Sequence, residues 1–177
     1  MHTVRTNIRL TLMSALLSVM LVLLIVTPVW IFLSGEQVFI QTVLDIAEMP
    51  LADRINVTPS SGRLMLALVV LYMPVLIFSY CLWHGIKIVS HVRDGHLLDR
   101  VLALRVKKIA IAMTAIGVML PLCRFLFPVL IYAESEYFQI IIDIGDITCV
   151  LIGGLLYVTF QSMLTGIKAK EEVEEFI

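Results

Sequence analysis

The stretch LTLMSALLSVMLVLLIVTPVWIFL, residues 10–33, decides the fold of this chain. It contains no charged residue, and a helix needs about 20 mostly apolar residues to cross the hydrocarbon core of a bilayer. Arg5 and Arg9 precede it as in a secretory signal peptide, but the run is longer than the apolar region of such a peptide and no small-residue cleavage site follows it. The sequence therefore predicts a first membrane span that is retained.

Three further apolar runs follow, at residues 64–83, 109–131 and 140–164. Runs of this length exclude the strands of a membrane β-barrel, which have about 10 residues and alternate between apolar and polar side chains. We therefore expect an all-α integral membrane protein in which residues 1–177 form a single domain and the four transmembrane helices form a four-helix bundle.

The composition excludes other classes of protein. Hydrophobic residues make up 60% of the chain and charged residues 15%, whereas a soluble domain is about 45–50% apolar and about 25% charged. The net charge of −1 indicates no basic surface for nucleic acid. All three cysteines lie inside apolar runs, without the spacing of a disulfide framework or a zinc site.

The distribution of Lys and Arg predicts the orientation of the spans. Residues 1–9 carry two of these residues, the connection at 84–108 carries six and the tail at 165–177 carries two, whereas the connection at 34–63 carries only Arg54 and Arg63. Lys and Arg concentrate in the cytoplasmic segments of membrane proteins. Both termini and residues 84–108 are therefore expected in the cytoplasm and residues 34–63 outside, in a bacterial inner (plasma) membrane.

The external connection at 34–63 contains a second type of helix pattern. Apolar residues recur at helical spacing between residues 38 and 49, with Gln41, Asp45 and Glu48 on the opposite face. This pattern is typical of an amphipathic helix. The helix is expected to be short, because Pro50 ends it, and to lie either on the membrane surface or over the mouth of the bundle.

Arg124 is the one Lys or Arg inside a span, in the outer third of the third span. A lone arginine at that depth costs at least about 2–3 kcal/mol, so a partner or a water-filled cavity is expected. Asp143 and Asp146 enter the fourth span from the outside, three residues apart and hence on one helix face. The sequence predicts an Arg124–Asp146 pair, as an interhelical tie, as part of a proton or ion pathway, or in a polar ligand cavity that opens outward. The tie is favoured because the cytoplasmic halves of these spans hold few polar residues.

Small residues recur every four positions along the fourth span, at Gly145, Cys149 and Gly153. Such a seam lets another helix approach closely. The expected partner is the third span, through Ala110, Thr114 and Gly117, although a homodimer would use the same kind of face.

The cytoplasmic segments offer contacts outside the bilayer. Val173, Phe176 and Ile177 form an apolar edge on the charged tail, which predicts a docking site for a cytosolic protein. His84, His91 and His96 in the connection at 84–108 match no metal-binding spacing, so no metal ion and no other cofactor is expected. That connection is basic enough to contact anionic lipid headgroups.

No catalytic motif is present, so the chain is not expected to be an enzyme. Two function classes remain. In the first, the protein acts by binding a membrane or cytosolic protein or a second copy of itself, as a membrane regulator, as an accessory subunit or as an immunity-type protein that intercepts a pore-forming toxin. In the second, it is a small proton- or ion-coupled transporter or channel that uses Arg124, Asp143 and Asp146.

Several features after the first span occur together in one known layout: Leu71-Tyr72-Met73-Pro74, the connection at 85–100, the span entry at 104–109, a proline in the third span, a short acidic connection and a charged tail ending in Ile177. Over about residues 64–177 the chain resembles an uncharacterised family of small four-span bacterial inner-membrane proteins. Members are often encoded beside helix-turn-helix regulators, so the resemblance implies a membrane-bound regulatory partner and transfers no catalytic residue. Leu97-Leu98 and Phe176-Ile177 depart from the family's loop and tail.

Overall fold

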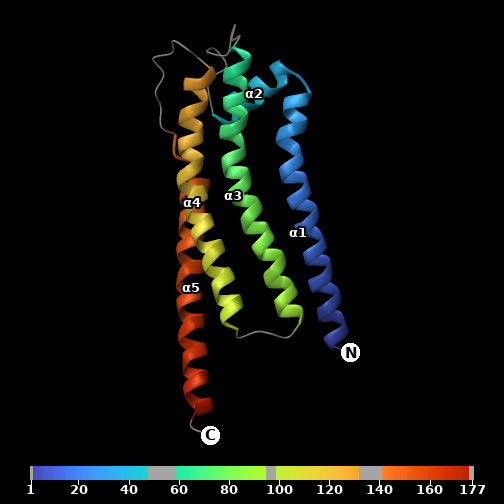
Figure 1. Cartoon of the computed structure of the whole chain (residues 1–177), viewed down its shortest axis with the longest axis vertical. Coiled ribbons are helices and arrows are strands. Elements are labelled where there is room, and N and C mark those ends of the chain that lie inside the picture. The colour runs from blue at the N-terminus through green and yellow to red at the C-terminus, as the bar shows by residue number, and fades with distance from the viewer. Residues whose placement is uncertain (1, 48–58, 95–98, 132–140, 176–177) are drawn as a thin grey trace.

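The computed structural model describes residues 2–47, 59–94, 99–131 and 141–175, and all regular structure in them is helical (Figure 1). The helices are α1 (His2–Leu33), α2 (Glu36–Ile46), α3 (Ser61–Arg93), α4 (Arg100–Ile131) and α5 (Ile144–Glu175). All but α2 are long and apolar enough to cross a membrane. The prediction of an all-helical chain with four long apolar helices is confirmed.

The long helices extend beyond the predicted spans, mainly between the second and the third. The second apolar run ends at Trp83, but α3 continues to Arg93, and α4 already begins at Arg100. No proline interrupts residues 84–94, so the helix continues after the apolar run has ended. Most of the predicted connection at 84–108 is therefore helical.

The four long helices form an open row in chain order. α1 packs against α3, α3 against α4 and α4 against α5, and no other pair of long helices makes more than marginal contact within the described residues (Figure 1). The four helices of the expected bundle therefore pack as an open row within the described residues. The physical reason lies in α1, which is apolar all round between residues 10 and 33 and so has no polar face to set which side turns inward.

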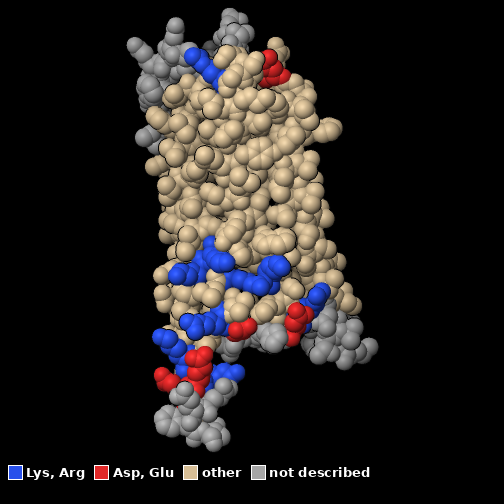
Figure 2. Space-filling model, viewed as in Figure 1, with Lys and Arg blue, Asp and Glu red and all other residues tan. Residues whose placement is uncertain are grey.

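The two ends of the row differ. The start of α1, the end of α3, the start of α4 and the end of α5 share one end, which we call the termini end (Figure 1). The opposite end holds α2, and we call it the α2 end. On the face seen in Figure 2, Lys and Arg gather toward the termini end, and a broad uncharged band separates them from the α2 end.

α2 lies in the mouth between α1, α3 and α4, and its buried side chains form the largest core of the molecule. Phe39 and Val43 have no exposed surface, and the Phe39 ring meets Phe32 of α1 edge to face at 5.2 Å. The side chains packed around them include Leu64 and Ala67 of α3 and Cys123, Phe127 and Ile131 of α4. The exposed side of α2 carries Gln41 and Asp45.

Two smaller cores lie nearer the termini end. Cys81 of α3 packs with Ala112 and Ile116 of α4, and Ala103 of α4 packs with Phe160 and Ile167 of α5. Large apolar side chains elsewhere on the long helices point outward, for example Leu16 on α1 and Leu155 on α5, which is 69% exposed. The row therefore buries little of its apolar surface within itself.

Candidate functional site: the charged cluster between α4 and α5

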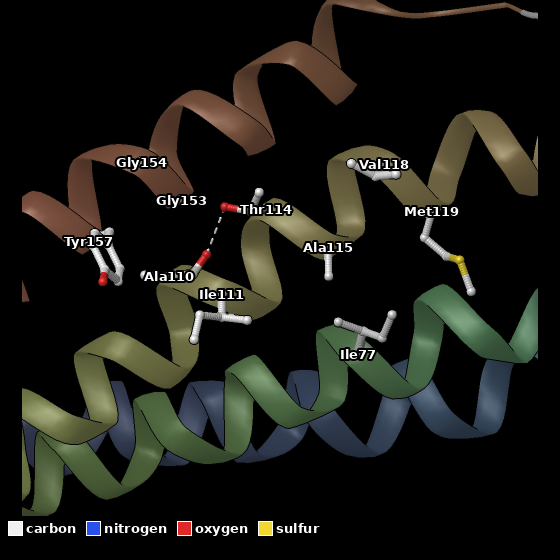
Figure 3. A pocket seen from close by; sticks show the side chains of 10 residues that line it. All are labelled: Ile77, Ala110, Ile111, Thr114, Ala115, Val118, Met119, Gly153, Gly154 and Tyr157. Carbon is white, nitrogen blue, oxygen red and sulfur yellow. Dashed lines mark hydrogen bonds between the residues drawn. The ribbon is translucent and has the colours of Figure 1, made fainter.

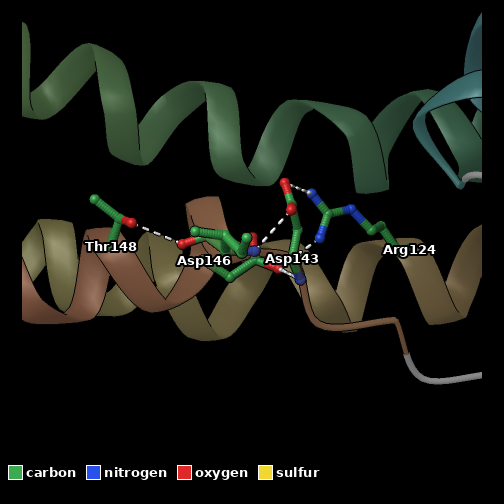
Figure 4. A network of polar contacts seen from close by, with 5 residues as sticks. Arg124, Asp143, Asp146 and Thr148 are labelled. Atoms are coloured by element: carbon green, nitrogen blue, oxygen red, sulfur yellow. Dashed lines mark hydrogen bonds and ion pairs between the residues drawn. The ribbon is translucent and has the colours of Figure 1, made fainter.

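Arg124 of α4 forms an ion pair with Asp146 of α5 (Figure 4). Its Nη1 donates a hydrogen bond to Asp146 Oδ2 at 2.5 Å, and the side chains of Arg124 and Asp146 are only 12% and 2% exposed. Asp143 Oδ2 lies 3.9 Å from Arg124 Nη2, and its side chain is half exposed. The structure thus brings the three predicted residues together, with Asp146 as the close, buried partner and Asp143 as the outer one.

The start of α5 holds both carboxylates in place. The backbone N–H of Asp143 donates to Asp146 Oδ2 at 2.9 Å, and that of Ile144 donates to Asp143 Oδ1 at 2.7 Å. Carboxylates are favoured at this position, because the first N–H groups of a helix lack partners within the helix and carry partial positive charge. Asp146 therefore caps its own helix and pairs with Arg124 through the same oxygen.

The other carboxylate oxygen of Asp146, Oδ1, differs from Oδ2 in its hydrogen bonding. Oδ1 is buried and has no hydrogen-bond partner among the described residues. An unsatisfied buried acceptor costs about 1–3 kcal/mol. The sequence predicted the pair but not this atom, because the pattern of charges does not show which carboxylate oxygen faces a donor.

Close packing of α4 on α5 positions the pair. A Cβ atom on Gly117 of α4 would come within 2.5 Å of the backbone oxygen of Asp146 and 2.6 Å of Val150 Cγ2. A side chain at this position would push apart the turns of α4 and α5 that carry the ion pair. Gly117 is therefore part of the site through the close approach that it permits.

The predicted seam on α5 meets α4 only in part. A Cβ atom on Gly153 would overlap Thr114 Oγ1 and lie 2.8 Å from the carbonyl oxygen of Ala110. Cys149 packs against the core of Cys81, Ala112 and Ile116. A Cβ atom on Gly145 would meet only Asp143 Oδ2, at 3.3 Å, so Gly145 does not contribute to the approach of the two helices.

The polar side chains nearer the termini end do not continue the cluster in the described part of α4 and α5. The hydroxyls of Thr114, Thr159 and Ser162 each donate to the carbonyl four residues earlier in their own helix. Gln161 Nε2 contacts Tyr157 Oη at 3.4 Å. These groups are satisfied locally, so they provide no chain of polar groups leading away from Arg124.

The remaining predicted residues lie at the termini end. Val173 is 60% exposed, while Phe176 and Ile177 lie outside the described residues, as does His96. His91 Nε2 lies 3.0 Å from Asp99 Oδ2. This contact joins the end of α3 to the residue that precedes α4. Within the described ranges no group of three or more His, Cys, Asp and Glu is placed to hold a metal ion.

Comparisons of the chain with protein family models, with curated proteins and with solved structures find no match. The resemblance to four-span bacterial membrane proteins therefore stays a prediction. The geometry described above carries the functional argument alone.

Proposed function

We propose that this chain is a multi-pass membrane protein with both termini in the cytoplasm, and that it acts by binding other proteins. Four long apolar helices support the first part, because their outward side chains, such as Leu16 and Leu155, suit lipid and not water. An isolated soluble row of this kind would expose far more apolar surface than soluble proteins do.

The orientation rests on the charges. Apart from Arg63 and Arg124, the Lys and Arg whose side chains are described lie at the termini end: Arg9, Lys87, Arg93, Arg100, Arg105, Lys107, Lys108, Lys168 and Lys170. By the positive-inside rule this end faces the cytoplasm. Trp30 near the α2 end and Trp83 near the termini end are exposed, as expected of aromatic side chains at the two membrane surfaces. A bacterial inner membrane fits this orientation.

The observation that carries the binding function is the exposed end of α5. Among residues 144–173 of this helix Ile167 is the last buried one, and every residue from Lys168 to Val173 is exposed. At 1.5 Å per residue a helix of 32 residues is about 48 Å long, more than the roughly 30 Å of a hydrocarbon core. The end of α5 therefore projects into the cytoplasm, with Val173 among Lys170, Glu171 and Glu172 as an edge for a cytosolic partner.

The role that fits these features is that of a membrane regulator, an accessory subunit or an immunity-type protein. The test is affinity purification of the full chain in mild detergent, compared with a chain that ends at Lys168. V173D removes the apolar edge, and E172Q is the matched control that changes only the charge. We expect one specific partner with the full chain and with E172Q, and its loss with the truncated chain and with V173D. A partner retained by the truncated chain, or no specific partner at all, contradicts the proposal.

A transporter is the second candidate, and the unpartnered Oδ1 of Asp146 is the observation in its favour. A buried carboxylate oxygen without a donor is a place where a proton or a cation binds. Proton flux into liposomes that contain the purified protein distinguishes the two functions. The binding function predicts the flux of protein-free liposomes, whereas flux that D146N abolishes in a folded protein would establish transport.

A further inference from the structure

One face of the row carries an apolar trough of about 780 Å³ (Figure 3). Its larger side chains are Ile77 of α3, Ile111, Val118 and Met119 of α4, and Tyr157 of α5. Between them lie small residues of α4 and α5, among them Ala115 and Gly154. The trough runs along α4 and spans from α3 to α5.

The trough offers few polar groups for recognition. The hydroxyl of Thr114 already donates to the carbonyl oxygen of Ala110 at 3.0 Å, and the hydroxyl of Tyr157 is contacted by Gln161. Gly154 keeps the trough open, since a Cβ atom there would meet nothing within 4 Å. Its neighbour Gly153 is needed for the approach of α5 to α4, but Gly154 is not. The shape and chemistry of the trough therefore suit a flexible hydrocarbon chain.

Basic groups lie at the cytoplasmic mouth of the trough, in the orientation proposed above. Lys107 and Lys108 come seven residues before Thr114 and Ala115 on α4, and His84 comes seven residues after Ile77 on α3. Seven residues are about two helical turns, so each basic group lies on the same side of its helix as the trough residue, about 10 Å nearer the termini end. Figure 2 shows Lys and Arg gathered toward the termini end of the molecule.

These basic groups are free to bind an anion. Lys107 Nζ lies over the Phe160 ring at 5.4 Å, and neither Lys107 nor Lys108 forms an ion pair with another described residue. Burial, together with the nearby positive charges of Lys108 and Arg105, lowers the pKa of His84, so the positive charge at the mouth comes from the lysines and Arg105. The Nδ1 of His84 is buried without a hydrogen-bond partner among the described residues. Positive charge without acidic partners thus collects where the trough reaches the membrane surface.

We propose that the trough binds one acyl chain of an anionic phospholipid, whose phosphate is held by Lys107, Lys108 and His84. Long lysine side chains reach from the apolar region to the headgroup level, and cytoplasmic basic residues attract anionic lipid. A helix of a second copy would also fill the apolar trough, but it would leave the basic groups at the mouth without counter-charge. This site rests on the proposed membrane orientation and goes beyond the binding of a protein partner.

The test measures lipid retained by the purified full chain in native mass spectrometry, with phosphatidylglycerol and phosphatidylcholine of equal chain length as probes. We expect phosphatidylglycerol to bind about 30-fold more tightly, because each lysine near an anionic headgroup contributes a factor of about five. K107Q/K108Q is expected to remove this preference, whereas K168Q/K170Q, which removes the same charge from the end of α5, is expected to keep it.

A second pair of variants tests the trough itself. G154L fills the open space and is expected to abolish binding of both lipids, and L155F is the control that enlarges an outward side chain on the opposite side of α5. The site is overturned by a preference that survives K107Q/K108Q, by lipid that G154L retains or by displacement of the lipid by inorganic phosphate alone. Cross-linking of two copies in lipid-free detergent that G154L abolishes would instead assign the trough to a second copy.

Failure of the lipid site and failure of the proposed function give different results. A chain that alkaline carbonate extracts from the membrane contradicts the membrane function itself. A carbonate-resistant chain without a preference for phosphatidylglycerol contradicts the lipid site only.

Discussion

The α2 end and the trough are both gaps beside α3 and α4, but only the first is filled by the chain. At the α2 end, Phe39 and Val43 occupy the gap completely, and the Arg124–Asp146 pair ties α4 to α5 nearby. At the trough, Ala115 and Gly154 leave the gap open. The comparison teaches that the chain fills the gap at the α2 end with its own side chains, whereas the trough midway along α4 stays open to surrounding molecules.

The largest expected effect on the free energy of unfolding is at the Arg124–Asp146 ion pair. R124L leaves the buried carboxylate of Asp146 without its counter-charge, and breaking a buried pair in this way costs about 3–5 kcal/mol. The measurement is the free energy of unfolding in mixed detergent and SDS micelles. R124L/D146L is expected to regain most of the loss, because two apolar side chains replace the pair. An R124L chain as stable as the wild type but altered in proton flux would assign the pair to transport.

The next largest effect is expected at α2, whose buried side chains fill the gap between α1, α3 and α4. F39A removes a fully buried ring from the core between α2, α3 and α4, and such a truncation costs about 3 kcal/mol or more. V118A shortens a side chain that lines the trough and is mostly exposed, so its expected cost is below about 0.5 kcal/mol. The same unfolding measurement checks both variants. Equal costs would show that the two gaps are filled to the same degree.

The sequence predicted the Arg124–Asp146 pair because a charged residue inside a span has few possible partners. Arg124 at that depth needs a partner or a water-filled cavity, and Asp146 is the acid at a matching depth on the next span. The four long helices could be predicted for a similar reason, since each apolar run is long enough to span a bilayer. These are properties of single segments or of one charged pair.

The arrangement of the helices could not be predicted in this way. Lipid and a protein core are both apolar, so a helix such as α1 that is apolar all round does not show which side faces its neighbours. The four-residue spacing predicted Gly145, Cys149 and Gly153 as a seam, but only Cys149 and Gly153 meet the neighbouring helices. The trough remained hidden, because the sequence pattern does not separate a small residue that packs from one that leaves space.

The smallest expected effects come from two neighbouring glycines, one packed against α4 and one that lines the open trough. G153A places a methyl group onto Thr114 and the carbonyl oxygen of Ala110, and overpacking of this kind costs about 1–3 kcal/mol. G154A places the same methyl group in open space, where alanine instead favours the helix by up to about 1 kcal/mol. The free energies of unfolding of the two variants should therefore change in opposite directions. Destabilisation by G154A would mean that a neighbour already fills the trough, and the measurement repeated after addition of phosphatidylglycerol would show whether that neighbour is lipid or protein.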